Sequence, residues 1–173
     1  KSLYSIYNWG IHTICTILFT VTGLMIVPFV QIYTSGITDT NYNLPVFALL
    51  ITIAFFFDSL RNCQYVLIRA AGHFKQTQTA SLIECFLNLS VSIVLVFFFG
   101  LSGVAIGTIV ATVFFVVYET VYFNKHIVFI PIKYFMKQFL VDTLIVAVTA
   151  IIAVQINLFT GSIGSWILQA MVV

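Results

Sequence analysis

Long apolar segments alternate with short polar connections along this chain. A helix needs about 20 residues, at about 1.5 Å of rise each, to cross the hydrocarbon core of a membrane. Five segments reach that length, namely residues 11–33, 45–72, 79–99, 103–123 and 139–159, and residues 166–173 resemble the start of a sixth. Strands of a membrane barrel are about half as long and alternate between apolar and polar positions, unlike these segments. The pattern predicts an all-α, polytopic transmembrane bundle with five full spans and a truncated sixth.

The composition agrees with a lipid environment. Of the 173 residues, 61% are hydrophobic and 7% are charged, and the mean hydropathy is +1.13. Because a soluble domain carries about a quarter charged residues, we expect membrane lipids to solvate most of the surface. The net charge of +2 is too small to indicate a nucleic acid partner. We interpret residues 1–173 as one transmembrane unit and as a fragment of a longer protein.

Basic residues fall in every second connection between the apolar segments. All but one of the seven lie before the first segment, after the second, or between the fourth and fifth: Lys1, Arg69, Lys75, Lys125, Lys133 and Lys137. Connections on the cytoplasmic side of an inner membrane carry such an excess. We therefore predict that residues 73–76 and 125–137 are cytoplasmic, with 125–137 lying along the lipid interface. Residues 34–44 and 160–165, which contain no Lys or Arg, should be extracytoplasmic.

The remaining basic residue, Arg61, lies inside the second segment. It belongs to a polar set that recurs at spacings of three and four residues and so shares one helix face: Asp58, Arg61, Asn62, Tyr65 and Arg69. Arg61 would lie roughly 16 Å from the inner end of the span. An arginine inside a membrane costs at least ~2.5 kcal/mol on insertion scales. It should therefore face the bundle interior or a watery cavity and have a partner.

The third segment offers candidate partners, because Glu84 and Asn88 lie on its polar face. A short turn joins the second and third segments, so we expect antiparallel neighbours with Glu84 and Arg61 at similar depths. Two hypotheses follow. In the first, Arg61 pairs with Glu84 or Asp58 and only fixes the register of the helices. In the second, Arg61 and Arg69 line a cavity and bind an anionic head group, for which a bidentate guanidinium is well suited.

Other polar positions give weaker signals. His12, Thr16 and Thr20 line up along the first segment. We interpret them as satisfying the helix backbone or neighbouring polar groups, with a proton or ion role as the alternative. Glu119 and Asp142 lie close to the expected cytoplasmic interface, where a carboxylate can reach water, so we expect both to be solvated.

Small residues and a proline indicate how the helices pack. Gly103, Gly107 and Ala111 form a ladder at four-residue spacing, which lets two helix backbones approach closely in a membrane. Pro28, near the outer end of the first segment, predicts a kink or an early unwinding there. Its role is either packing or a hinge.

No catalytic motif is evident. The chain lacks the patterns of a hydrolytic triad, a paired catalytic carboxylate set, a metal cluster or a cofactor site, and its three cysteines lack disulfide or zinc spacing. A membrane glycosyltransferase or sugar polymerase would need a large loop with catalytic groups. The longest connection here has about a dozen residues, as short as ordinary loops between helices. We therefore do not expect an enzyme.

Three stretches carry a family resemblance: PFVQIYTSG, DTNYNLPVFALL and LIRAAGHFKQTQTASLIECFLNLSVSIVLVFFFGLSGVAIGTIVA. Together they resemble the polysaccharide and oligosaccharide flippases of the multidrug/oligosaccharidyl-lipid/polysaccharide exporter superfamily, which serve O-antigen and capsule assembly in bacteria. The resemblance runs from about Pro28 to Ala150. It implies the C-terminal lobe of a two-lobed bacterial inner-membrane transporter, whose missing N-terminal lobe is its partner.

By the same resemblance, the substrate is an undecaprenyl-pyrophosphate-linked oligosaccharide, moved across the membrane by alternating access. The candidate substrate-binding residues are Asp58, Arg61, Arg69, Glu84 and Asn88. A multidrug or other lipid-precursor exporter of the same superfamily is the alternative. A structural membrane subunit that transports nothing is a third hypothesis.

Overall fold

The computed structural model describes residues 2–37, 42–129 and 132–155. Its elements are α1 (Ser2–Tyr33), α2 (Pro45–Ala70), α3 (Phe74–Phe99), α4 (Leu101–Phe123), a π-helical turn η1 (Asn124–Val128) and α5 (Ile132–Gln155). The described part of the chain is all-α, as predicted. Four of its helices are long and apolar enough to cross a membrane: α1, α2, α3 and α4 with η1. The truncated sixth span falls outside the described residues, and the count of five full spans stays a prediction.

Most helices begin earlier than the apolar segments do. α1 starts at Ser2 rather than residue 11, α3 at Phe74 rather than residue 79, and α5 at Ile132 rather than residue 139. Hydropathy detects only the lipid-facing stretch, whereas backbone hydrogen bonding continues through the polar end of a helix. The described residues of the segment 125–137 are divided between η1 and the start of α5, with Phe129 following η1. Its position along the lipid interface stays a prediction.

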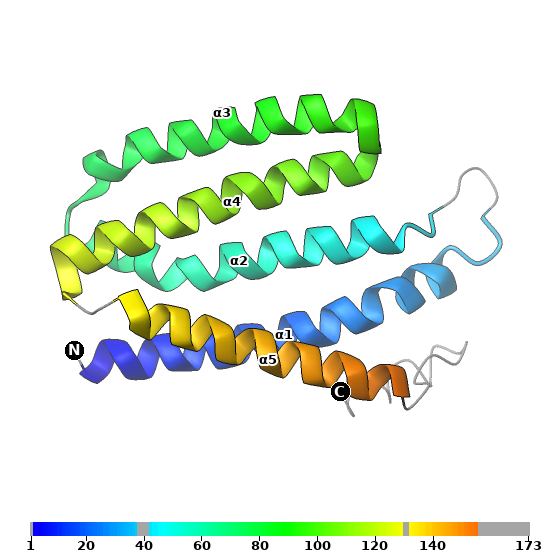
Figure 1. Ribbon diagram of the computed structural model, residues 1–173, viewed down its shortest axis with the longest axis horizontal. Helices are drawn as coiled ribbons and strands as arrows, with labels where there is room; N and C mark the ends of the chain where they lie inside the picture. The colour runs from blue at the N-terminus through cyan, green and yellow to red at the C-terminus, as the bar shows by residue number, and fades with distance from the viewer. Residues whose placement is uncertain (1, 38–41, 130–131, 156–173) are drawn as a thin grey trace.

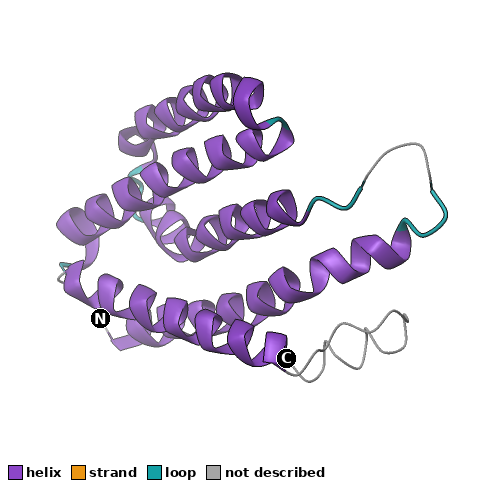
Figure 2. Cartoon of the chain, turned by 45° about the vertical axis from the view of Figure 1, so that its right-hand side comes forward, coloured by secondary structure: helices purple, strands orange, loops and turns teal. Residues whose placement is uncertain are grey.

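The helices pack side by side in the order α3, α4, α2, α1, α5, with α5 crossing α1 (Figures 1 and 2). α4 lies between α2 and α3, so the prediction that the second and third spans are neighbours is wrong. α2 and α3 nevertheless run antiparallel to each other, as predicted (Figure 1). The connections after α2 and α4 lie at one end of the bundle with the N-terminus, and those after α1 and α3 lie at the other (Figure 1). The basic connections therefore gather at one end, which we call the basic end.

Close backbone contact explains why α4 packs on α3. A methyl group added at Gly103 would collide with the backbone of Leu95, and one added at Gly107 would lie 2.7 Å from the Ser92 nitrogen. The predicted role of the glycine ladder in helix packing is confirmed. Gly100 alone joins α3 to α4, with a φ of 57° that favours glycine.

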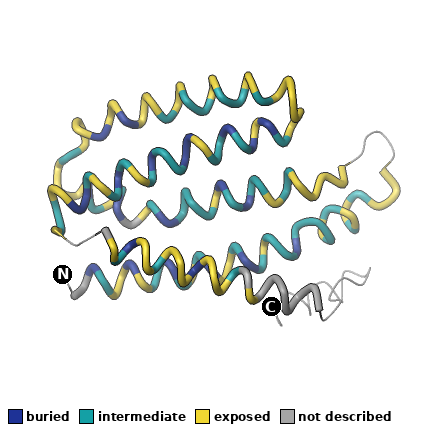
Figure 3. Tube along the Cα trace, viewed as in Figure 1, coloured by how far each residue is buried: buried dark blue, intermediate teal, exposed yellow. Residues whose placement is uncertain are grey.

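Near the basic end, four helices share an apolar core. Tyr4 of α1, Ile68 of α2, Phe123 of α4 and Phe135 of α5 are buried together, and the Tyr4 ring lies 5.1 Å from that of Phe123. α3 contributes little to this core and lies at the edge of the layer, with much of its surface exposed (Figure 3). At the opposite end, α1 continues through Pro28 to Tyr33, so the expected unwinding at Pro28 does not occur.

Candidate functional site

Arg61 of α2 is held between two carboxylates. Its Nη2 lies 2.6 Å from Oδ1 of Asp58, one turn earlier on the same helix, and its Nε donates to the same oxygen at 2.7 Å. Its Nη1 lies 3.8 Å from Oε2 of Glu119, which α4 contributes. The guanidinium also lies 4.7 Å from the centre of the Phe115 ring, a cation–π distance. The arginine inside this candidate span is thus partnered, as its solvation energy would require in a membrane.

Glu119 was expected to be solvated, and that expectation is wrong. Its side chain is 1% exposed, and its Oε2 has no hydrogen-bond partner in the described part of the chain. The reason is its helix face: Ala111, Phe115 and Phe123 lie on the same four-residue stripe of α4, and all are buried. Distance along the chain from a basic loop does not report on which face of a helix a residue lies.

The two candidate residues of α3 have different surroundings. Glu84 is within electrostatic reach of Arg61 and Asp58, but no ion pair within 4.0 Å links it to either in the described structure. Because α4 separates α3 from α2, the predicted Glu84–Arg61 pair does not form. Asn88 accepts a hydrogen bond from Ser92 at 3.1 Å and lies 3.5 Å from the Thr108 hydroxyl of α4. Asn88 therefore supports the contact between α3 and α4.

Arg69 lies near the basic end of α2 and is exposed. Its guanidinium carbon lies 4.0 Å from the centre of the Tyr65 ring and 5.0 Å from that of Phe74. Among the described residues, no carboxylate lies within ion-pair distance of Arg69. Of the five predicted site residues, the structure thus brings Asp58 and Arg61 into contact and places Glu84 nearby. It links Arg69 to Arg61 only through the shared Tyr65 ring, and it leaves Asn88 apart.

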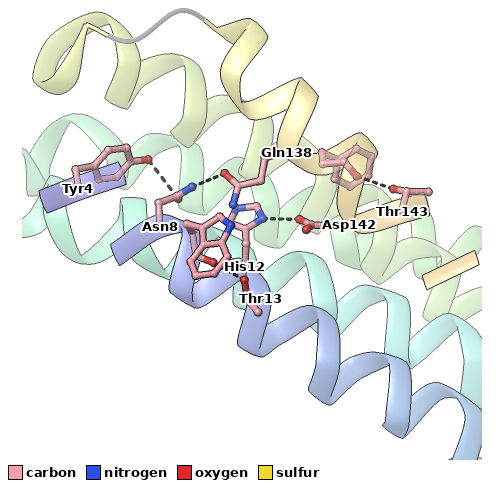
Figure 4. A network of polar contacts seen from close by, with 9 residues as sticks. Tyr4, Asn8, His12, Thr13, Gln138, Asp142 and Thr143 are labelled. Atoms are coloured by element: carbon pink, nitrogen blue, oxygen red, sulfur yellow. Dashed lines mark hydrogen bonds and ion pairs between the residues drawn. The ribbon is translucent and has the colours of Figure 1, made fainter. Parts of the chain in front are cut away.

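A second polar cluster, which we call the seam, joins α1 to α5 (Figure 4). Asn8 donates from Nδ2 to Oε1 of Gln138 at 2.9 Å, and His12 Nδ1 lies 2.6 Å from Oδ2 of Asp142. The side chains of His12 and Asp142 are each 8% exposed. The expectation that Asp142 is solvated is therefore wrong, because α1 covers it. The interpretation that His12 satisfies a neighbouring polar group is confirmed.

The sequence analysis missed Asn8 and Gln138. A signal for Asn8 was present, because polar residues recur every four positions on one face of α1 and all are buried: Tyr4, Asn8, His12, Thr16 and Thr20. The expected first span began at residue 11 and so omitted the first two members of this stripe. On α5, Gln138 and Asp142 repeat the same spacing.

A scan against protein-family models, a search of curated proteins and a search of solved structures found no match for this chain. Its class is therefore defined by its own features: a helical chain with several candidate membrane spans and two buried clusters of ionisable groups.

Proposed function

We propose that this chain is one lobe of a transporter that moves an undecaprenyl-pyrophosphate-linked oligosaccharide across a bacterial inner membrane. The family resemblance of residues 28–150 and the four apolar helices support this function. The observation that carries the proposal is the cluster of Asp58, Arg61 and Glu119 inside candidate spans. Ionisable groups at such depth are costly and commonly mark substrate or ion pathways.

The two partners of Arg61 differ in accessibility, which suggests how a head group binds. The side chain of Asp58 is 46% exposed and that of Glu119 is 1% exposed. A pyrophosphate can displace the accessible Asp58, while the buried Glu119 stays beside the guanidinium. The planar guanidinium then offers two parallel N–H donors to the phosphate oxygens. Arg69, exposed and without an acidic partner among the described residues, would meet the anion first.

Net charge limits this mechanism. The neighbourhood holds the guanidinium groups of Arg61 and Arg69 and the carboxylates of Asp58, Glu84 and Glu119. Carboxylates outnumber guanidinium groups, so an anion enters only when one carboxylate moves away or takes up a proton. The same excess favours a cationic substrate, as in a multidrug exporter of the superfamily, as the second candidate.

Substitution of Arg61 in the full-length protein tests the proposal. Arg61→Ala should abolish export of the glycan while membrane insertion persists. Arg61→Lys should restore export only partly, since an ammonium lacks the bidentate fork. Export of the glycan in cells is compared at equal protein level. Full export by Arg61→Ala would refute a direct role in binding.

A purely structural role makes a different prediction. Because Arg61 is already paired, removing it alone would leave Glu119 buried without a partner and destabilise by ~3–5 kcal/mol. Arg61→Leu combined with Glu119→Leu removes both charges together. Normal export by the double variant would establish a structural ion pair and exclude substrate binding. Loss of export at normal thermal stability would support binding.

A further inference from the structure

The His12–Asp142 pair lies between two cavities. His12 lines a cavity of about 340 Å³ that also touches Gln64 of α2 and Thr120 of α4. Asp142 lines a groove of about 630 Å³ between α1 and α5 that also touches Thr16 and Lys137. Each member of one hydrogen-bonded pair therefore borders a different space.

Hydrogen bonding leaves one ring nitrogen of His12 available. A carboxylate can only accept, so with Asp142 ionised the Nδ1–H of His12 donates to Oδ2 across the 2.6 Å contact. The Nε2 atom makes no hydrogen bond within the described part of the chain and is then a free acceptor. One turn further along α1, the Thr16 hydroxyl oxygen is also buried and has no partner among the described residues.

Few charges surround the pair. On α5, Lys137 borders the same groove as Asp142, and on α1 the Cys15 thiol is within electrostatic reach of that carboxylate. From α2 and α4, the groups that border the His12 cavity are the neutral Gln64 and Thr120. Of the charged residues of those two helices, Asp58 and Glu119 contact Arg61, and Arg69 lies against the rings of Tyr65 and Phe74 instead.

We propose that the His12–Asp142 pair is a proton-binding site that fastens α1 to α5. A proton bound at Nε2 changes the pair from a net charge of minus one to a neutral imidazolium–carboxylate ion pair. Burial favours the neutral pair and therefore the closed seam. Loss of the proton leaves a net negative charge in a poorly hydrated site. Water then enters the groove beside Asp142 and α1 separates from α5.

Two measurements on the full-length protein in lipid nanodiscs test the site. First, ¹⁵N spectra of labelled histidine, with His12 assigned from a His12→Gln variant, are recorded from about pH 8.5 to about pH 5.5. His12 should change from the neutral to the imidazolium pattern.

Second, spin labels at the exposed positions Leu18 and Leu144, in a variant without other cysteines, report the distance between α1 and α5. A population with a longer distance between the two spin labels should appear at the high-pH end.

Two variants separate the proton site from the rest of the seam. Asp142→Asn keeps the shape and can still bond to His12, but it removes the negative charge, so the population with a longer distance at the high-pH end should disappear. Gln138→Met removes the neighbouring seam hydrogen bond without a titratable group, so the pH response should persist. An unchanged His12 spectrum, a persistent response in Asp142→Asn, or its loss in Gln138→Met would each overturn the proposal. Should Asp142→Asn fail to fold, the wild-type spectrum and distance decide alone.

Neither measurement includes a transported substrate. A result that refutes the proton site would therefore not refute the proposed transport function. A result that refutes the transport function would likewise not refute the proton site.

Discussion

Adding one methyl group at Gly107 should destabilise the protein, although alanine is the better helix former. The new Cβ would meet the Ser92 hydroxyl and would lie 2.7 Å from the Ser92 nitrogen and 2.9 Å from its Cα. Two of these atoms belong to the backbone, so a change of rotamer cannot relieve the contact. α3 and α4 would have to separate. Overpacking of this kind costs ~1–3 kcal/mol.

Other glycines of the chain provide matched controls. A methyl group at Gly10 of α1 would meet nothing within 4 Å, and one at Gly23 would lie 3.6 Å from the Thr52 methyl, an ordinary contact. Replacing glycine by alanine inside a helix gains ~0.5–1 kcal/mol when space permits. Gly10→Ala should therefore stabilise by about that amount, with Gly23→Ala close to it. Gly107→Ala should be net destabilising, by up to about 2.5 kcal/mol after the same gain is subtracted.

The three alanine variants are compared by reversible unfolding in mixed detergent micelles, with wild type alongside. The expected order of stability is Gly10→Ala, then Gly23→Ala, then wild type, then Gly107→Ala. Gly107→Leu should fall further still, because its side chain is larger. A Gly107→Ala variant as stable as Gly10→Ala would show that α3 and α4 do not approach as closely as described, and would refute the packing argument.

Three further outcomes are expected. His12→Leu leaves the Asp142 carboxylate buried and should cost up to ~4 kcal/mol at neutral pH, the free energy of protonating an ordinary carboxylate there. Asp142→Leu leaves an imidazole, which can be buried in its uncharged form, and should cost ~1–2 kcal/mol; equal losses in a denaturant titration would contradict this asymmetry. Arg69→Ala should lower stability by no more than ~1 kcal/mol, because it removes exposed cation–π contacts, so a large loss of export at nearly unchanged unfolding free energy would assign Arg69 to the substrate path. A cysteine at the exposed position Ser35 should react with an impermeant thiol reagent in intact cells and one at Gln76 should not; the opposite labelling would invert the predicted topology.

The approximate positions of the helices could be predicted from the sequence, but which helices pack against one another could not. The ladder beginning at Gly103 predicted a close contact for α4 but did not indicate which helix makes that contact. The structure shows that α4 has two contact faces. Positions four residues apart drift by about 40° around a helix, so the buried stripe from Gly103 to Phe123 faces α3 at one end and α2 at the other. A helix with two such faces lies between its partners, which is why the short turn after α2 did not make α3 its neighbour.

Burial of single charges was harder to predict than the helices themselves. Arg61 could be recognised because its polar neighbours shared one face of an apolar helix. Glu119 has only apolar residues on its four-residue stripe and Asp142 has only Gln138 one turn before it, so their positions near basic loops suggested solvation. Each is covered by a partner on another helix, Arg61 for Glu119 and His12 for Asp142. Such pairing depends on which helices pack together, and a single sequence does not contain that information directly.

The two pairs differ in one chemical respect that bears on movement. An arginine keeps its charge at every physiological pH, so Arg61 stays charged between α2 and α4 under all such conditions. A histidine gains or loses its charge in that range, so the contact of α1 with α5 can respond to protons. If the bundle moves during transport, α2, α3 and α4 should move as one body, since the Arg61 contact joins α2 to α4 and the close contact at Gly107 joins α4 to α3. The change of shape should then occur at the seam between α1 and α5.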